Sequence, residues 1–454
     1  MLLPEHPRIH VVGAGGAGMS GLARILAQSG HTVSGSDLVA GRPLLDLEEV
    51  GIDVWDGHRP EAVTGVDLLV RSSAVPDRDP EVVAAEGAGV PTWGRPALLE
   101  AITAHFTTIG ATGTHGKTST TALLVSAVEG LGREPSFLVG GQLVDHGTNA
   151  AYRDPGLLVL EADEAFGTFL HLHLAGLVVT NVEAEHLDHY GDVEAMEDAF
   201  VTVMRAVEGP VVACIDDPGA ERAMARGGGV PYGTSEGAAW RITDLEEGPL
   251  DVRFTLSHPG GRLPVRVGRP GLHMARNAAG ALALLGESGY DVSAAADALA
   301  DFSGVTRRYH LRSRVRGVTI IDDYAHHPTE VMATVRTAGL GSWRRVWAIF
   351  QPHLYSRTAA LANEFGQAFA GVDELVVTDV YGSREQPVPG VSGRLVADAA
   401  RARTDANVRY LPHMGDIADA IAPELEPGDL VLTLGAGDIT VLADELARAL
   451  AVLP

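Results

Sequence analysis

A chain of 454 residues is long enough for roughly two to four domains, and its 46% hydrophobic and 20% charged content is typical of a globular protein. The formal net charge of −25 argues against nucleic acid or an anionic membrane as a partner, so neither is expected. The single cysteine, Cys214, excludes an internal disulfide. With no apolar run of ~20 residues and no signal-peptide pattern at the N-terminus, we expect a cytoplasmic protein.

The first elements form a strand, a glycine-rich turn and a helix. An apolar strand at residues 9–12 precedes a turn with the spacing G-x-G-x-x-G, and a second strand pattern ends in an acid about 20 positions later. Read alone, this pattern predicts a binding site for NAD, but any dinucleotide or nucleotide-sugar with a diphosphate fits it equally. The candidate ligand-binding residues here are Gly13, Gly15, Gly16, Ala17, Gly18, Met19, Ser36 and Asp37.

Two small hydroxyl residues follow a further strand pattern at residues 66–70. Ser72 and Ser73 would face the crevice at the carboxyl ends of the strands, where ligands bind in such sheets. A serine in a loop is also commonly just solvated, so both interpretations stay open.

A second glycine-rich stretch lies at residues 109–121, between a strand pattern and a helix pattern. Its Gly-Lys-Thr ending supplies a lysine for the β- and γ-phosphates and a hydroxyl for Mg²⁺, although Ala111 stands where the strict pattern has glycine. Lys117 is the only lysine in the chain, and it offers a compact ammonium where arginine would present a wide planar fork. The predicted ATP-binding residues are Gly110, Ala111, Thr112, Gly113, Thr114, His115, Gly116, Lys117, Thr118 and Ser119.

Acidic residues follow two apolar strand patterns after this loop. The strand at 157–160 ends in Glu161, and the strand at 176–180 leads to an acidic cluster around His186. Because parallel strands end at one edge of their sheet, these side chains would lie near the nucleotide together with Thr118. Carboxylate and hydroxyl oxygens suit Mg²⁺, and an imidazole also suits Mn²⁺, so the expected metal is Mg²⁺ or Mn²⁺.

The remaining chain predicts two more regions. Residues 239–268 alternate polar and apolar side chains, which indicates an antiparallel excursion. Beyond it, strand patterns at 318–321, 346–350, 374–378 and 429–434 alternate with helical patterns at 328–338, 358–370, 393–402 and 440–452. The adjacent pair His326 and His327 either faces a ligand at a strand end or belongs to a turn before a helix that starts at Pro328.

We therefore predict an α/β protein of three domains. A Rossmann-like domain at residues 1–104 would precede a central domain at 105–307, which resembles P-loop ATPases and has a mostly parallel sheet. A second Rossmann-like domain would occupy residues 308–454.

Three functions fit these residues. The first is an ATP-dependent ligase or kinase acting on a diphosphate-bearing substrate, the second an NAD-dependent dehydrogenase, and the third a nucleotide switch or scaffold without chemistry. Two separate phosphate-binding loops favour the first, because a dehydrogenase has no need for Lys117 and a switch has no need for the N-terminal crevice. Nicotinamide reduction without ATP would support the second, and nucleotide binding without substrate-stimulated hydrolysis the third.

Six motifs together resemble the Mur ligase family over almost the whole chain. They are Gly-Gly-Ala-Gly-Met-Ser at 15–20, Thr-Gly-Thr-His-Gly-Lys-Thr at 112–118, Glu-Ala-Asp-Glu at 161–164, Asp-Asp-Tyr-Ala-His-His-Pro-Thr-Glu at 322–330, Phe-Gln-Pro-His at 350–353 and Gly-Ala-Gly-Asp-Ile at 435–439. The resemblance implies ATP-dependent ligation of L-alanine to the carboxylate of UDP-N-acetylmuramate in peptidoglycan precursor synthesis, through an acyl phosphate. The alternative is a related ligase of this family that adds a peptide or another amino acid, such as glycine or L-serine.

The resemblance also implies roles for individual residues. UDP would bind at the first glycine turn and at Ser72 and Ser73, and the adenine of ATP near Asn277. Thr118, Glu161 and His186 would hold two Mg²⁺ ions, and the third domain would complete the nucleotide site and bring in L-alanine. The enzyme would be a monomer or a homodimer. The predicted catalytic residues are Lys117, His186, His326 and Arg357.

Four positions depart from the family pattern. Ala165 and Phe166 stand where the family has Ser and Asp, which removes a hydroxyl and a carboxylate near the metal edge. Leu354 replaces a frequent Arg, so Arg357 would hold the carboxylate of the amino acid alone, and Met274 replaces a frequent Asn. With no second lysine, the chain also lacks the carbamylated lysine that bridges metals in several sibling ligases.

Overall fold

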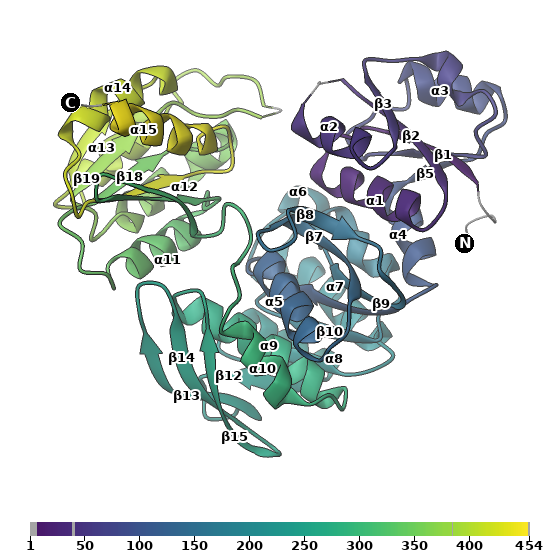
Figure 1. Ribbon diagram of the computed structural model, residues 1–454, viewed down its shortest axis with the longest axis horizontal. Coiled ribbons are helices and arrows are strands. Elements are labelled where there is room, and N and C mark those ends of the chain that lie inside the picture. The colour runs from purple at the N-terminus through teal and green to yellow at the C-terminus, as the bar shows by residue number, and fades with distance from the viewer. Residues whose placement is uncertain (1–6, 39–40, 384, 453–454) are drawn as a thin grey trace. The chain divides into compact units, whose positions relative to one another are not determined.

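The computed structural model describes residues 7–38, 41–383 and 385–452, in which the chain forms two compact units that contain three β-sheets (Figure 1). The first unit comprises the chain up to Leu245 together with Arg253–Gly268 and Met274–Ser303, and the second comprises Glu246–Val252, Arg269–His273 and the chain from Gly304. The predicted α/β class with mostly parallel sheets is confirmed. The domain boundaries after residues 104 and 307 stay predictions.

The N-terminal sheet has the strand order β3-β2-β1-β4-β5, and its strands are parallel. They are β1 (Arg8–Val12), β2 (Thr32–Asp37), β3 (Asp53–Asp56), β4 (Leu68–Arg71) and β5 (Thr92–Gly94). Apolar residues of α1 (Ala17–Gln28), α2 (Arg42–Glu48) and α4 (Arg95–Thr103) share one core with the strands, and α3 (Pro80–Gly87) shares another. The strand order reverses beside β1, which places the glycine turn at the point where such sheets bind ligands.

The central sheet has ten strands in the order β15-β14-β13-β12-β11-β10-β6-β9-β7-β8. They are β6 (Thr107–Thr112), β7 (Pro135–Leu143), β8 (Thr148–Ala151), β9 (Asp154–Glu161), β10 (Gly176–Val179), β11 (Val211–Cys214), β12 (Val230–Gly233), β13 (Trp240–Glu247), β14 (Val252–His258) and β15 (Gly261–Val267). The last three occupy the region of alternating residues. Cys214 is buried in β11, as its apolar surroundings predict.

Helical elements flank this sheet in the chain, and apolar residues of several of them share a core with its strands. They are α5 (Lys117–Gly130), the 3₁₀ segment η2 (Ala165–His171), α6 (Leu187–Tyr190), α7 (Val193–Ala206), α8 (Pro218–Gly227), α9 (Leu272–Glu287) and α10 (Val292–Leu299). Since β6 lies between β9 and β10 in parallel register, the phosphate loop after β6 lies between the end of β9, at Glu161, and the end of β10, which acidic residues follow in the chain.

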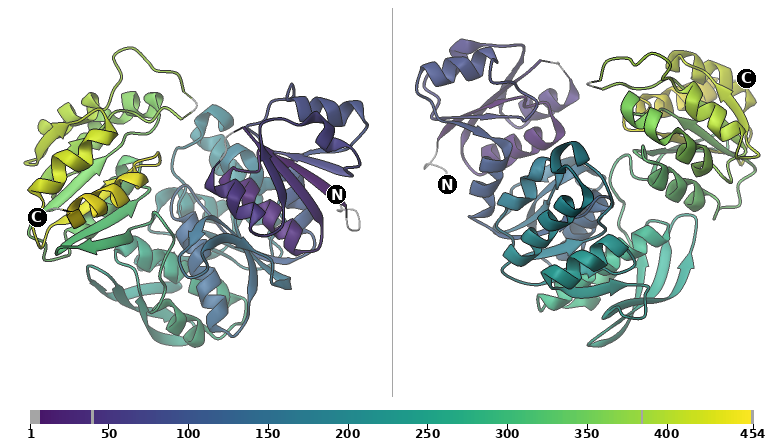
Figure 2. Two further views of the ribbon diagram at one scale, coloured as in Figure 1. Left: turned by 45° about the horizontal axis from the view of Figure 1, so that its top comes forward. Right: turned by 180° about the vertical axis from the view of Figure 1, so that it is seen from behind.

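The C-terminal sheet has the order β16-β17-β21-β18-β19-β20, and only β16 pairs antiparallel among these described strands. Its strands are β16 (His310–Val315), β17 (Val318–Asp323), β18 (Val346–Phe350), β19 (Glu374–Val377), β20 (Asn407–Tyr410) and β21 (Leu430–Leu434). One core joins the sheet to α11 (Pro328–Ala338), α12 (Tyr355–Ala368) and α13 (Arg394–Arg401), and a second joins it to α14 (Ile417–Ile421) and α15 (Thr440–Val452). Helices therefore cover both faces, which Figure 2 shows from two sides.

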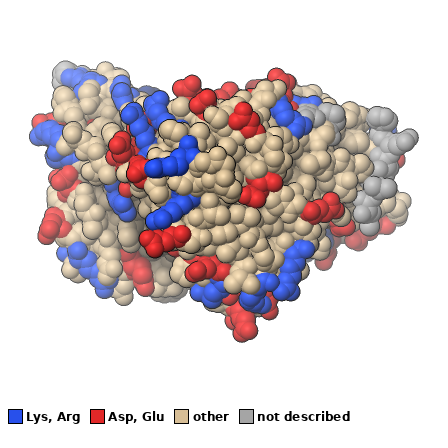
Figure 3. All heavy atoms as spheres, turned by 90° about the horizontal axis from the view of Figure 1, so that it is seen from below, with Lys and Arg blue, Asp and Glu red and all other residues tan. Residues whose placement is uncertain are grey.

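Two surface properties bear on possible partners. Among the described residues, none of the helices is long and apolar enough to span a membrane. The face drawn in Figure 3 carries basic groups as well as acidic ones, so the excess of acidic residues does not make that face uniformly negative.

Candidate active site

The phosphate loop joins β6 to α5, and two glycines in the left-handed region determine its shape. Gly113 has a φ of 134° and Gly116 a φ of 82°. A Cβ atom on Gly113 would lie 2.1 Å from Oγ1 of Thr180, and one on Gly116 would lie 2.9 Å from Oδ1 of Asn277. Any larger residue would therefore collide as well as strain the backbone. The loop leads directly into the N-terminus of α5, whose unpaired backbone N–H groups favour anions.

Lys117 is held inside this loop by three acceptors. Its Nζ atom donates to the carbonyl oxygens of Gly113 at 2.7 Å and Thr114 at 3.2 Å, and to Oε1 of Glu164 at 2.8 Å. Burial opposes its charge, but the nearby carboxylates, Glu164 first, outweigh burial and raise the pKa of Lys117. The ammonium is therefore charged and already positioned at the loop.

Thr118 and Glu161, both predicted metal ligands, lie in direct contact. The Thr118 hydroxyl donates to Oε1 of Glu161 at 3.0 Å, and the backbone N–H of Gly140 donates to Oε2 at 2.5 Å. A Cβ atom on Gly140 would lie 2.6 Å from that same Oε2 atom, so the carboxylate lies directly against the backbone of β7. The structure thus brings together an oxygen pair beside the phosphate loop.

His186 belongs to a neighbouring group of acids. Its Nε2 atom lies 3.6 Å from Oε1 of Glu164, and the possible ligand atoms of Glu164, Glu185 and His186 all lie within 4.8 Å of one another. Burial raises the pKa of Glu164 to about 7, and Asp163 adds to this effect while Lys117 opposes it. His186 is therefore grouped with Glu164 and Glu185, which the sequence analysis did not select, whereas Glu161 contacts Thr118.

The loop after β10 fixes the phosphate loop from the other side. The Asn181 side chain accepts from the backbone N–H of His115 at 2.7 Å and donates to the His115 carbonyl at 2.9 Å. The Thr180 hydroxyl also donates to that carbonyl, at 2.6 Å. Sequence reasoning missed Thr180 and Asn181 as supports, although their position directly after a buried strand is a usable signal.

Asn277 lies in α9 and is buried against the end of the phosphate loop, at Gly116. Its contact with the adenine of ATP stays a prediction. Met274, one of the departures from the family pattern, is buried in the same helix and has no polar group to offer a base.

The N-terminal glycine turn is fixed by the end of β2. The backbone N–H groups of Gly13 and Ala14 donate to the Ser36 carbonyl at 2.8 and 2.9 Å, and that of Gly15 donates to Oδ2 of Asp37 at 2.9 Å. A Cβ atom on Gly15 would lie 2.9 Å from the same Oδ2 atom. Asp37, a candidate ligand-binding residue, therefore holds the turn.

The other predicted members of this site differ in their accessibility. Ser72 packs against Gly13, where a Cβ atom on the glycine would lie 2.9 Å from the Cβ of Ser72, and Ser73 is exposed. The backbone N–H of Gly16 closes the turn by donating to the carbonyl oxygen of Gly13 at 3.3 Å. The side chain of Met19 is buried in the hydrophobic core, where it packs with the sheet, and a contact of this residue with the substrate stays a prediction. The side chain of Ala17 lies outside the described residues.

Ser36 is committed to a buried network. Its hydroxyl donates to Oε2 of Glu81 at 2.5 Å, while Oε1 of Glu81 accepts from the backbone N–H of Arg59 at 2.8 Å and from the Trp55 indole at 3.3 Å. Burial opposes the charge of Glu81, but the nearby ring of His10, at 3.6 Å, and hydrogen bonds from Ser36 and Arg59 outweigh it and lower the pKa to about 2. Ser36 therefore anchors Glu81 beneath the turn.

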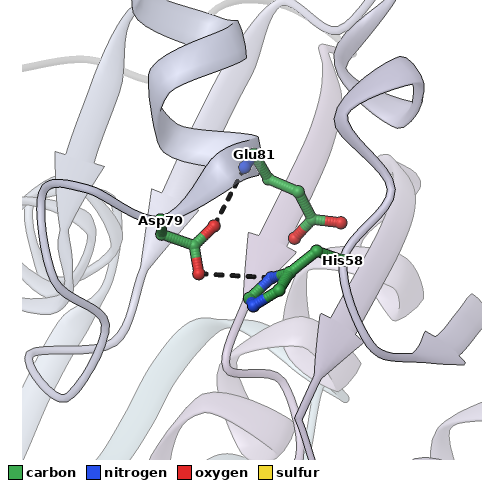
Figure 4. Close-up of side chains that lie close together, drawn as sticks. All are labelled: His58, Asp79 and Glu81. Atoms are coloured by element: carbon green, nitrogen blue, oxygen red, sulfur yellow. Dashed lines mark hydrogen bonds and ion pairs between the residues drawn. The ribbon is translucent and has the colours of Figure 1, made fainter.

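A second group with possible metal ligands adjoins this network. Figure 4 shows Asp79 between the backbone nitrogen of Glu81, at 2.9 Å, and the ring of His58, at 3.3 Å. Both oxygens of Glu81 are already occupied by the donors named above, so the group works as a helix cap for α3 and a structural support.

The C-terminal unit holds its own cluster at the ends of β17 and β18. The ring of His326 packs edge-to-face on Tyr324 and His353, and Nη1 of Arg357 lies 3.4 Å from Nδ1 of His353. Burial lowers the pKa of His326, and burial together with His326 and Arg357 lowers that of His353 to about 4. Two neutral imidazoles therefore lie beside a guanidinium, and His353 is a member that the sequence analysis did not select.

The adjacent residue His327 has the alternative role that its sequence position suggested. It is the N-cap of α11 and forms a capping box with Glu330, whose carboxylate accepts from the backbone N–H of His327 at 3.2 Å. The Asp322 side chain accepts from Thr433 and Thr440, which commits it to the sheet. Of the two histidines, only His326 joins the side-chain cluster.

Two of the departures lie in strained backbone. Phe166 has a φ of 56° and is 60% exposed, and Leu354 has a φ of 69° at the N-cap of α12. The small Ala165 lies in the same turn as Phe166. Because Ala165 and Phe166 stand where the family has Ser and Asp, a turn directly after Glu164 lacks these polar groups.

The donor set at the phosphate loop fits ATP with Mg²⁺. A threonine hydroxyl and carboxylates are hard oxygen ligands, and Oε2 of Glu164 is buried without a hydrogen-bond partner among the described residues. Lys117 supplies the charge that phosphates require. Together with the glycines of the loop, these groups could hold a phosphate-bound divalent cation.

Comparisons with known proteins identify the family of this chain. Three family models match in succession: the Mur ligase family catalytic domain at residues 8–107, the Mur ligase middle domain at 111–285 and the Mur ligase glutamate ligase domain at 307–437. A UDP-N-acetylmuramate–L-alanine ligase of Mycolicibacterium vanbaalenii is 44% identical, with 97% of this chain and 96% of that protein covered. One of Thermobifida fusca is 40% identical, with 98% and 96% covered.

Solved structures of this family share the fold of the chain. The UDP-N-acetylmuramate–alanine ligase of Thermotoga maritima superimposes with a TM-score of 0.83 at 27% identity, covering 98% of this chain and 99% of that one. A murein peptide ligase of Psychrobacter arcticus, at 24% identity and a TM-score of 0.70, shares the fold over 99% of each chain. The chain belongs to the Mur ligase family.

Proposed function

We propose that this chain is an ATP-dependent ligase that joins L-alanine to the carboxylate of UDP-N-acetylmuramate, with ADP and phosphate as the other products. The full-length relatives with this name support the reaction. The observation that carries the proposal is the phosphate loop, in which a single, charged lysine lies among carboxylates that can hold a metal. The glycine turn of the first sheet supplies a separate place for the UDP diphosphate.

The reaction needs charge neutralisation more than a protein nucleophile. The muramate carboxylate attacks the γ-phosphate to give an acyl phosphate and ADP, and the alanine amine then attacks the acyl carbon, loses a proton and releases phosphate. Lys117 balances charge on the transferred phosphoryl group. Thr118, Glu161 and His186 would hold Mg²⁺, which neutralises the charge that develops on the phosphates.

Lys117 must exchange partners before it can act. Its three hydrogen bonds go to two loop carbonyls and to Glu164, so binding of a phosphate has to replace at least the contact with Glu164. Asn181 and Thr180 hold the loop in place through His115 while this exchange occurs. The loop backbone is therefore prepared in advance and the lysine side chain is the part that moves.

The C-terminal cluster is assigned to the amino acid. Arg357, which lies beside His353, would pair with the alanine carboxylate, since Leu354 brings no charge. The neutral rings of His326 and His353 add no positive charge that would repel the alanine ammonium.

Phosphate release from ATP tests this function. We expect release to require UDP-N-acetylmuramate and an amino acid together, and to be fastest with L-alanine when glycine and L-serine are compared at equal concentration. Lys117→Met should abolish release while UDP-N-acetylmuramate still binds with affinity near that of the wild type. ATP turnover that ignores the UDP substrate, or full activity in Lys117→Met, would contradict the assignment.

A further inference from the structure

The guanidinium of Arg95 lies between the glycine turn of the first sheet and the acidic end of β9. Arg95 is the first residue of α4. A Cβ atom on Gly18 would lie 3.0 Å from both Cζ and Nη2 of Arg95, so the arginine lies directly over the last glycine of the turn. On its other side, Nη1 lies 3.7 Å from Oδ2 of Asp163. Asp163 directly precedes Glu164, the partner of Lys117.

The donors of this arginine are poorly satisfied. A guanidinium has five N–H groups, and the Asp163 contact at 3.7 Å is an ion pair too long for a good hydrogen bond. The Nε atom is buried and has no hydrogen-bond partner among the described residues. Such a group leaves strong donors available to an anion, and the planar fork of arginine matches the oxygens of a phosphate.

We propose that Arg95 binds the diphosphate of the UDP-linked substrate at the glycine turn, and that Asp163 positions its guanidinium there. The proposal rests on the proposed function, which places a UDP diphosphate at this turn. A side chain at Gly18 would crowd the guanidinium, because a Cβ atom there would lie 3.0 Å from it. The sequence analysis selected neither Arg95 nor Asp163 as a ligand-binding residue.

The position of Arg95 has a second consequence. The same side chain contacts the turn that holds one end of the substrate and the strand end beside the residues that act on the other end. A diphosphate that pairs with the guanidinium therefore also fixes the distance between the UDP site and the phosphate loop. The competing explanation is a purely structural tie between α4 and the segment after β9.

Calorimetric binding of UDP and of ATP to the full chain separates these two explanations. Arg95→Met should weaken UDP binding by about tenfold or more, because it removes charged hydrogen bonds to phosphate, while ATP affinity stays within about twofold. Arg95→Lys should fall between the two, since an ammonium keeps the charge but loses the fork. Asp163→Asn should weaken UDP binding less than Arg95→Met does.

Arg24→Met is the matched control. Arg24 lies in α1, a helix that packs on the same sheet, and donates to the backbone carbonyl of Asp46 at 3.0 Å, away from the turn. UDP should therefore bind this variant as it binds the wild type. If Arg95→Met and Arg95→Lys bind UDP as tightly as the wild type and lose only thermal stability, Arg95 is a structural tie and the inference is wrong. If the wild type itself fails to bind UDP, the proposed function is overturned and the inference with it.

Discussion

At the residue scale, three carboxylates surround one lysine. The pKa of Lys117 is raised by Glu164, Asp163 and Glu161 against the effect of burial, and burial raises the pKa of Glu164 to about 7. This excess of negative charge repels the phosphates of ATP when no metal is present. Glu164 is therefore both the support of Lys117 and its competitor for phosphate.

Glu164→Gln tests that competition. The amide keeps the shape but removes a charge, so ATP should bind about three- to tenfold more tightly in EDTA than it binds the wild type, as measured by calorimetry. Glu129→Gln is the control, because that partly buried carboxylate pairs with Arg153 and His146 away from the loop and should leave ATP affinity unchanged. Weaker metal-free binding in Glu164→Gln would show that Glu164 supports the lysine without competing for it.

Glu81 makes stability depend on pH in a defined direction. Its pKa falls from 4.5 in the unfolded chain to about 2 when folded, because His10, Ser36 and Arg59 outweigh the cost of burial. A depressed carboxyl pKa contributes stability that is complete above pH 4.5 and is lost as the pH falls toward 2. The shift corresponds to about 3 kcal/mol at neutral pH.

The corresponding variant is Glu81→Gln. We expect it to unfold at a clearly lower urea concentration than the wild type at pH 7, and the difference to shrink as the pH is lowered below about 4.5. Unfolding monitored by circular dichroism between pH 7 and pH 3 measures both effects. A difference that stays constant with pH would mean that the carboxylate charge contributes nothing.

At the scale of elements, the first turn of α8 supports the loop after β10 through a glycine. A Cβ atom on Gly219 would lie 2.0 Å from the backbone oxygen of Val182, and the Val182 N–H donates to Oδ1 of Asp217 at 3.0 Å. The neighbouring residue Asn181 holds His115 in the phosphate loop. A change at α8 is therefore transmitted to the nucleotide site through backbone contacts.

Gly219→Ala should destabilise the chain by about 1–3 kcal/mol, because the added methyl group meets backbone that cannot move aside cheaply. It should also raise the KM for ATP by displacing Asn181. Gly87→Ala at the end of α3 is the control: a Cβ atom there meets nothing within 4 Å, so the melting temperature should be unchanged or slightly higher. Equal behaviour of the two variants would contradict the proposed route from α8 to the loop.

Elements and contacts differed in how well they could be predicted. In the C-terminal sheet, the helix at residues 328–338 and the inner strands β17 and β18 could be predicted from apolar runs and flanking turns, because these patterns are local. The edge strands β16 and β20 were missed, since they are partly exposed and lack such runs. Arg95 and Asp163 are 68 positions apart, and no local pattern encodes a contact of that kind.

The same distinction applies within the site. Motif spacing predicted Lys117, Thr118 and Glu161, because strand-loop-helix geometry fixes their positions. The spacing selected Met19 as well, although the side chain of Met19 is buried in the core. It also could not show that the Asp37 carboxylate holds Gly15, since that contact depends on how β1 and β2 pair.

At the scale of the whole molecule, the chain is acidic, whereas each of the two proposed phosphate sites carries a positive charge. The chain has 59 acidic and 34 basic residues, so general attraction cannot gather anionic substrates, and local groups such as Lys117 and Arg95 must do so. The three sheets present these groups at strand ends or helix starts, where the fold fixes them.

The single lysine also makes the phosphate loop a unique target for proteolysis. A lysine-specific protease can cut these 454 residues only after Lys117, whose side chain is 14% exposed at the start of α5, so cleavage requires local unfolding of that segment. ATP should slow the cut in proportion to its occupancy, and a gel would show two fragments, residues 1–117 and 118–454. A cleavage rate indifferent to ATP would contradict nucleotide binding at this loop. One peptide bond thus reports on both opening and ligand binding at the loop.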